Sequence, residues 1–245
     1  MKNKKIKTAI VGLRFGGEVP QLYRDHPDVS DVVICDQEEK LLNEFGNKFN
    51  FTNRYANYDD LLDSDVDAIH IVTNIHTHHD LTVKALKAGK HCACTVPMAT
   101  TLSELQEIVN AEKSSGKNYM MMETAVYTYQ CLYVKELIEQ GRIGNIQFMR
   151  GIHFQDMEGW PQYWMGLPPM HYSTHAVSPL LFLSGLKMKS VRCLGSGMMR
   201  DELKSEYGNP FPVESALFQM KDQCLAAEVT RSLFQTAHEY VEGFT

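Results

Sequence analysis

Hydrophobic positions in the first half of the chain follow two alternating patterns. Short, nearly continuous apolar runs bounded by polar or glycine-containing segments predict buried strands. Between these runs, apolar residues recur every three or four positions, which predicts amphipathic helices. Strands that alternate with helices indicate a doubly wound parallel sheet covered on both faces. We expect strands at 7–13, 31–36, 67–72, 90–94 and 118–123, and helices at 17–25, 37–48, 78–88 and 101–115.

The pattern changes after residue 123. Helices are expected at 125–140 and 170–184, separated by a strand at 145–154 and a loop at 156–169 rich in Trp, Pro and Gly. The chain then reads as consecutive strands, which predicts a mostly antiparallel, open sheet. We therefore expect an α/β domain over 1–123 and an α+β domain over 124–245. The four final strands are expected at 189–197, 212–220, 224–234 and 238–244.

Composition and charge exclude several classes of protein. The net charge is −6 and the basic residues are scattered, which argues against a nucleic-acid interface. No apolar run approaches the roughly 18 residues that a membrane span needs, and the N-terminus lacks the apolar stretch of a signal peptide. The cysteines have neither zinc spacing nor the density of a disulfide scaffold. These features predict a cytoplasmic protein with reduced thiols.

The segment "AIVGLRFGG" lies where a dinucleotide-binding turn belongs, between the first strand and the first helix. The pattern requires glycine at three positions; Gly12 and Gly17 match, whereas Arg14 replaces the middle one and its guanidinium could instead reach a phosphate. Phe15 belongs to the same turn. Asp36 ends the second strand, where a carboxylate accepts hydrogen bonds from the adenosine ribose and repels a 2′-phosphate, so NAD is favoured over NADP. A flavodoxin-like or other α/β domain with a tight glycine turn is the alternative.

Several blocks resemble the Gfo/Idh/MocA oxidoreductases, the family of glucose–fructose oxidoreductase and inositol dehydrogenase. The most specific block is "ALKAGKH", and "GRIGNIQ" and "THAVSPLLFLSG" have looser counterparts. The resemblance runs from about residue 6 to the end. It implies a Rossmann domain that binds NAD, followed by an open sheet that carries the substrate and often the oligomer contact. It also implies cofactor contacts at Thr73, His78, Thr95 and Pro97, a sugar or polyol substrate and a homo-oligomer.

The chain departs from the family pattern at functional positions. The family's Glu-Lys-Pro becomes Thr95-Val96-Pro97, and Val96 cannot assist proton transfer as that lysine does. A valine at this position resembles the branch that includes NAD-dependent α-N-acetylgalactosaminidases. Chains of the family are usually longer, so we also expect this one to be truncated within its second sheet.

The segment "PPMHYSTHAV" places His171 and His175 four residues apart, on one face of the expected helix together with Ser178. A metal site would need a further ligand, such as Glu123 or Glu158, that nothing in the sequence brings near. Two ordinary hydrogen-bonded helix histidines are a second possibility. The third is proton transfer, because imidazole titrates near working pH and accepts an alcohol proton.

The family resemblance favours proton transfer by His175. We expect Tyr172 or His171 to assist it, and no metal. Glu123 follows the last strand of the first domain and is expected to face the substrate, since ligands bind beyond the carboxyl ends of parallel strands. Tyr127, Trp160 and Trp164 are candidate substrate contacts, although packing explains them equally well.

These features predict an NAD-dependent oxidoreductase that acts on a CH–OH group of a sugar, a polyol or a related compound. An NAD-dependent glycoside hydrolase with transient ring oxidation shares the same first step. A catalytically inactive NAD-binding relative is the third possibility.

Overall fold

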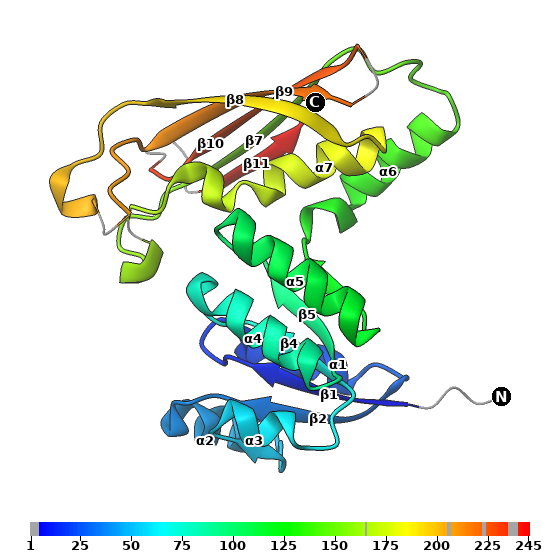
Figure 1. The fold of residues 1–245 in the computed structure, drawn as a ribbon, viewed down its shortest axis with the longest axis vertical. Coiled ribbons are helices and arrows are strands. Elements are labelled where there is room, and N and C mark those ends of the chain that lie inside the picture. Colours follow the sequence, from blue (N-terminus) through cyan, green and yellow to red (C-terminus); the bar gives the residue numbers. More distant parts are fainter. Residues whose placement is uncertain (1–4, 165, 205–206, 222–223, 235–239) are drawn as a thin grey trace. The chain divides into compact units, whose positions relative to one another are not determined.

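The computed structural model describes residues 5–164, 166–204, 207–221, 224–234 and 240–245 (Figure 1). The chain divides into two compact units, Met1–Met122 and Glu123–Thr245. Glu123, expected at the end of the first domain, therefore belongs to the second unit. Within the described part of the chain, no helix is long and apolar enough to cross a membrane.

The first unit is built on a six-stranded parallel sheet in the order β3-β2-β1-β4-β5-β6. Its strands are β1 (Ile6–Val11), β2 (Val29–Cys35), β3 (Arg54–Tyr55), β4 (Ala68–Ile71), β5 (His91–Thr95) and β6 (Tyr119–Met122). Its helices are η1 (Gly16–Glu18), α1 (Val19–Arg24), α2 (Glu39–Lys48), α3 (Tyr58–Leu62), α4 (Ile75–Lys87) and α5 (Leu102–Ser115). The expected doubly wound α/β fold is confirmed. The prediction missed β3 and α3, because two and five residues are too few to establish a period.

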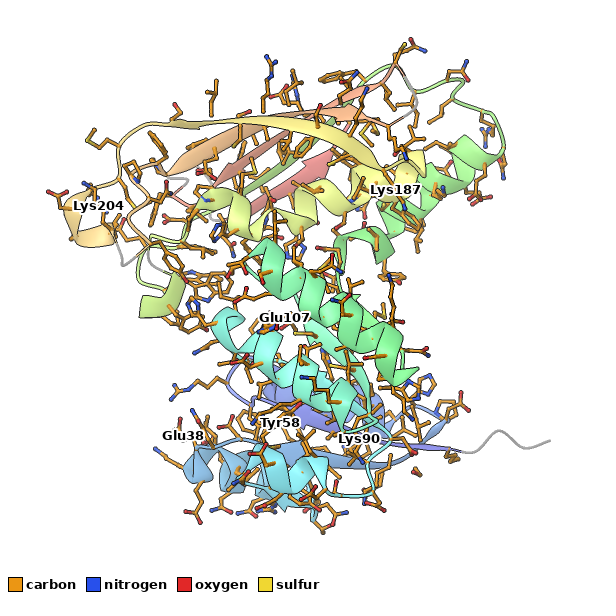
Figure 2. The ribbon with its side chains drawn as sticks, viewed as in Figure 1. Glu38, Tyr58, Lys90, Glu107, Lys187 and Lys204 are labelled. Atoms are coloured by element: carbon orange, nitrogen blue, oxygen red, sulfur yellow. The ribbon has the colours of Figure 1, made fainter. Side chains whose placement is uncertain are left out.

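Both faces of this sheet are buried, as continuous apolar strands predict. Alternate residues of β1 point to opposite faces: Ala9 joins a core cluster with α4 and α5, whereas Ile10 joins one with α1 and α2. Tyr58, labelled in Figure 2, links two helices by donating its hydroxyl to the Leu81 carbonyl at 2.8 Å. Helix α4 begins at Ile75, three residues before the expected position. The unit therefore has two apolar layers around one sheet.

Helix α5 has a side-chain cap at its first end and a glycine at its last. Thr101 caps it by accepting from the Glu104 amide at 3.2 Å, and the Glu104 side chain accepts from the Thr101 amide at 3.0 Å. Gly116 ends the helix with φ +65°.

The second unit is built on a five-stranded sheet in the order β11-β7-β10-β9-β8. Its strands are β7 (Met149–Gln155), β8 (Met188–Ser196), β9 (Val213–Met220), β10 (Ala226–Ser232) and β11 (Tyr240–Phe244). Its helices are η2 (Ala125–Tyr127), α6 (Tyr129–Glu139), η3 (Gln162–Trp164), η4 (Pro169–Tyr172), α7 (Thr174–Ser184) and η5 (Asp201–Leu203). Only β7 and β10 pair in parallel, so the expected mostly antiparallel sheet is confirmed.

Helix α7 lies directly against one face of this sheet, which we call the inner face (Figure 1). Gly151 on β7 makes this approach possible, since a Cβ there would lie 2.2 Å from the Ala176 carbonyl oxygen. Apolar residues of β7, β9, β10 and α7 fill the space between: Met149, Ala176, Leu180, Met220, Ala227 and Val229.

Two expectations for this unit were wrong in detail. The single helix expected over 170–184 is two helices, η4 and α7, because Ser173 between them has φ −106° and ψ 4°. His171 therefore lies outside α7 and does not share a helix face with His175. The strand expected over 145–154 begins only at Met149. Of the strand expected at 238–244, residues 238 and 239 lie outside the described residues.

Candidate active site

The turn after β1 has the conformation that its glycines predict. Gly12 has φ +94°, and a Cβ there would lie 2.5 Å from the Val72 carbonyl oxygen. A Cβ on Gly17 would lie 2.1 Å from the ring of Phe45 on α2. Glycine is thus required at both positions, which leaves the backbone of the turn open to close approach by a ligand.

Asp36, just beyond β2, organises this turn. One carboxylate oxygen accepts from the Leu13 amide and the other from the Glu38 amide, each at 2.8 Å. A carboxylate has about four acceptor positions, so Asp36 retains the capacity to accept from the hydroxyls of a ribose. The residues of this edge therefore fit a dinucleotide.

The other two residues of the turn project outward. Arg14 is exposed, and its guanidinium pairs with the Glu38 carboxylate at 2.5 Å. Glu38 is labelled in Figure 2. Phe15 is also exposed. Neither side chain is held by the core, and their roles toward the cofactor stay predictions.

His78 on α4 joins the ends of β4 and β5. Its ring is only 1% exposed; Nδ1 lies 2.7 Å from the Pro97 carbonyl oxygen and Nε2 lies 3.0 Å from that of Thr73. The Thr95 hydroxyl is 3.4 Å from Nε2, and the Val96–Pro97 peptide bond is cis. Burial lowers the pKa of His78, although both carbonyls act to raise it. His78 thus orders the segments that carry Thr73, Thr95 and Pro97.

In the second unit, Glu123, His175 and Tyr172 form a hydrogen-bonded chain. His175 Nδ1 lies 2.5 Å from Glu123 Oε1, and His175 Nε2 lies 3.0 Å from the Tyr172 hydroxyl. A carboxylate only accepts, so Nδ1 carries the proton; in the neutral ring, Nε2 then accepts from Tyr172. His175 comes from α7, Tyr172 from the end of η4, and Glu123 from the segment before η2. The three side chains can pass a proton along one line.

The surroundings of Glu123 and Tyr172 determine the charge state of each side chain. Burial raises the pKa of Glu123, but the hydrogen bond and charge of His175 and the Ala125 amide outweigh it, so that pKa is below its usual value. Burial raises the pKa of Tyr172 to about 12. At neutral pH the phenol is therefore a proton donor and Glu123 an anion.

The inner face of the sheet adds two residues that the sequence prediction missed. His153 and Arg231 are adjacent across β7 and β10, and both are fully buried. The His153 ring lies edge-on to His175, with 5.0 Å between centroids. Burial, with the charge of Arg231, lowers the pKa of His153 to about 2. A signal did exist, because His153 and Arg231 occupy positions in phase with the apolar inner-face residues Met149 and Val229.

The aromatic candidates separate into two groups. Trp164 packs on Tyr172, with centroids 5.0 Å apart, and Trp160 lies edge-on to Trp164 at 5.9 Å. Both tryptophans therefore belong to the surroundings of Tyr172. Tyr127 is exposed and makes no described ring contact with this cluster.

The geometry gives two of the expected residues contacts that the sequence did not predict. Glu123 is 4% exposed, and its Oε1 lies 2.5 Å from His175 Nδ1; its role toward the substrate stays a prediction. His171 lies edge-on to Tyr207, with 6.3 Å between centroids, because η4 ends before α7 begins. Of the two expected helpers, the structure brings only Tyr172 to His175.

Comparisons with known proteins agree with this fold. Glycosyl hydrolase family 109 protein 1 of Bacteroides thetaiotaomicron is 32% identical over 124 residues, which is 47% of this chain and 27% of that protein. Levoglucosan dehydrogenase of Pseudarthrobacter phenanthrenivorans is 30% identical over 130 residues, which is 53% of this chain and 33% of that protein. The chain thus aligns with a third or less of the length of these relatives.

Solved structures match nearly the whole chain. Apo scyllo-inositol dehydrogenase from Lactobacillus casei has a TM-score of 0.84 at 21% identity, covering 100% of this chain and 73% of that one. A levoglucosan dehydrogenase in complex with NADH and levoglucosan has a TM-score of 0.85 at 20% identity, covering 98% and 70%. At these identities the likeness shows the fold alone.

The family model described as "Oxidoreductase family, NAD-binding Rossmann fold" matches residues 6–123. This range includes the glycine turn, Asp36 and the segments that His78 orders. Residues 6–123, the NAD-binding Rossmann unit of the chain, therefore match the Gfo/Idh/MocA oxidoreductase family.

Proposed function

We propose that the protein is an NAD-dependent dehydrogenase that acts on a CH–OH group of a sugar or polyol, with His175 as the proton acceptor. The observation that carries the proposal is the Glu123–His175–Tyr172 chain, in which a buried carboxylate orients the imidazole and a phenol lies on its other nitrogen. The names of relatives that act on inositol and levoglucosan support the substrate class.

In this proposal the substrate hydroxyl gives its proton to the Tyr172 oxygen as the phenolic proton moves to His175 Nε2. The imidazolium that results is stabilised by Glu123, whose anionic carboxylate lies at Nδ1. Because the imidazole already accepts from Tyr172, the ring need not reorient before the transfer. Val96 occupies the position of the family's lysine, so this chain of residues would replace that lysine as the proton acceptor.

NAD, when bound, supplies the acceptor for the hydride that leaves the carbinol carbon. Gly12, Gly17 and Asp36 would hold it, and Thr73, Thr95 and Pro97 would border it on the segments ordered by His78. Arg14 and Phe15 are further candidate contacts from the turn. Asp36 favours NAD over NADP, since its negative charge repels a 2′-phosphate.

The test is a pair of absorbance assays with NAD and pools of sugars, polyols and nitrophenyl glycosides. NADH should accumulate with one pool, and His175→Ala should lower kcat by about 10²- to 10⁴-fold, the usual contribution of a general base. His26→Ala, at an exposed histidine of the first unit, is the control and should behave as wild type. Wild-type turnover in His175→Ala would refute the role of His175.

A glycoside hydrolase that uses NAD is the second candidate, supported by the family 109 relatives. It would oxidise a ring hydroxyl, eliminate the aglycone, add water and return the hydride, so the reaction is redox-neutral. Nitrophenol release that requires NAD but leaves no NADH would establish it. NAD binding with neither product would support an inactive relative and refute both enzymes.

We also propose that copies of the chain associate through the second sheet. Leu194 and Leu217 on β8 and β9 are large apolar residues that are mostly exposed, and they lie on the face opposite α7. Burial of such residues favours association. In analytical sedimentation, Leu217→Lys should shift the protein toward the monomer. If the wild type and Leu217→Lys both sediment as monomers, the proposal is refuted.

A further inference from the structure

Arg231 on β10 is a buried cation, and none of its hydrogen-bond acceptors among the described residues is a carboxylate. Its guanidinium is 0% exposed. Burying a charge among neutral groups costs free energy even when it is hydrogen-bonded. Burial lowers the pKa of Arg231 to about 10, so the cation persists at neutral pH. Its place in the core therefore calls for a functional explanation.

The guanidinium uses its planar geometry to bind in three directions. Nε donates to the Tyr172 carbonyl at 2.9 Å, Nη1 to the carbonyls of His153 and Ser232 at 3.0 and 2.5 Å, and Nη2 to Gln155 Oε1 at 2.9 Å. These contacts join η4 to β7 and to the end of β10. A lysine presents its donors from a single nitrogen and cannot reproduce this arrangement.

Tyr172 is held by the same guanidinium at two places. Nε binds its backbone carbonyl, and the guanidinium carbon lies 5.4 Å from the centre of its ring. Trp164 packs on the ring as well. With backbone and ring both fixed, the phenol is directed at His175 Nε2 across the irregular Ser173 junction.

We propose that Arg231 is a positioning residue that fixes the Tyr172 hydroxyl on His175 Nε2. The inference deepens the proposed function and rests on it for its catalytic consequence. Arg231 has a second effect in the same direction: with burial, its charge keeps the neighbouring His153 neutral, so that His153 does not compete with His175 for the proton.

The kinetic test is Arg231→Lys, which keeps the charge and removes the planar fork. We expect kcat to fall by up to about 100-fold, the cost of a misplacement of about 1 Å, with the affinity for NAD unchanged. Arg150→Lys is the matched control, because Arg150 lies on β7 in an exposed ion pair with Glu228 and should tolerate the change. In a Tyr172→Phe background, Arg231→Lys should cause no further loss, since it acts through that phenol.

A second readout does not depend on turnover. In protein labelled with ¹⁵N-histidine and assigned with His175→Gln, the Nε2 resonance of His175 should move in Tyr172→Phe and move similarly in Arg231→Lys. Gln155→Ala removes one guanidinium acceptor and should give a smaller shift in the same direction. Tryptophan fluorescence monitors folding of the second unit, because both tryptophans of the chain, Trp160 and Trp164, lie there.

The outcomes separate the two proposals. A wild-type protein without turnover, whose Nε2 resonance still responds to Arg231→Lys, would refute the dehydrogenase and keep the positioning role. An unchanged resonance in folded Arg231→Lys, or equal losses of kcat with and without the Tyr172 hydroxyl, would overturn the positioning role. Loss of the folded second unit in both Arg231→Lys and Gln155→Ala would assign Arg231 to stability alone and also overturn it.

Discussion

The two units place polar groups in their cores in different ways. The sheet of the first unit is mostly apolar on both faces, and its buried ring His78 bonds backbone carbonyls at the strand ends. The sheet of the second unit buries Arg231 on its inner face, and Glu123 is buried against His175 nearby. The first unit can bind a ligand through backbone geometry, whereas the second holds charges where a proton can be moved. The difference is consistent with the proposed division between cofactor binding and proton transfer.

The largest change that we expect from one substitution is in the second unit. Glu123→Gln keeps the shape of the side chain but allows its amide to donate to His175 Nδ1. The imidazole would then carry its proton on Nε2 and could not accept from Tyr172. We expect kcat to fall by about 10²- to 10⁴-fold, measured as NADH formation. Glu228→Gln is the control, because Glu228 forms an exposed pair with Arg150. An equal loss of kcat in Glu228→Gln would show that Glu123 has no special role.

The pH dependence of stability should differ between the units. Burial lowers the pKa of His70 in the first unit from 6.5 to about 4, and that of His153 in the second to about 2. Below pH 6.5 each histidine is protonated in the unfolded chain but stays neutral in the folded chain. The free energy of unfolding therefore falls as pH falls, down to about pH 4 for His70 and about pH 2 for His153. Above pH 6.5 both histidines are neutral in the folded and the unfolded chain, so their full contribution to stability is present.

Denaturant unfolding at a series of pH values can separate these contributions. Tryptophan fluorescence follows the second unit, and far-UV circular dichroism follows both. His70→Phe should flatten the acid loss seen by circular dichroism and leave the fluorescence transition in place, whereas His153→Phe should flatten the acid loss seen by fluorescence. A His70→Phe protein with the wild-type pH dependence in both signals would contradict the assignment.

Gly12→Ala tests the turn of the first unit. Because Gly12 has positive φ and a Cβ there would lie 2.5 Å from the Val72 carbonyl oxygen, the substitution should lower the free energy of unfolding by about 1–3 kcal/mol. It should also weaken NAD binding. Gly116→Ala is the matched control, because Gly116 also has positive φ but nothing within 4 Å of a Cβ. Calorimetric titration with NAD should show weaker binding only in Gly12→Ala; equal affinities would show that the turn does not approach the ligand.

The smallest effect should come from the end of α5. Thr101→Ala removes the side-chain cap and should lower the free energy of unfolding by about 1 kcal/mol. The fluorescence transition of the second unit should not move. A shift there as large as that in circular dichroism would show that the two units unfold together.

Much of the fold could be predicted from local pattern. The five longer strands of the first unit follow from neighbouring residues. In the second unit the strands were found, but the break at Ser173 was not, because "HYSTHAV" satisfies helical spacing on both sides of it. As a result His171 and His175 were expected on one face. The spacing of apolar and polar residues does not reveal that one residue, Ser173, has a non-helical ψ.

The candidate site was only partly predictable for the same reason. His175 and Tyr172 are three residues apart, and their pairing was among the expected possibilities. Glu123 was singled out, but its contact with His175 was not predicted, since the two residues lie 52 positions apart. Arg231 was not singled out, because its contact with the His153 carbonyl spans 78 residues.

The sequence by itself determined the order of strands and helices and the glycine turn at Gly12, because periodicity and positive φ depend on neighbouring residues. Only the tertiary structure decided which polar residues meet. The parallel register of β7 and β10 brings Arg231 to His153, and the docking of α7 brings His175 to Glu123. Such contacts depend on strand register and helix packing over long sequence separations, and no local pattern records them.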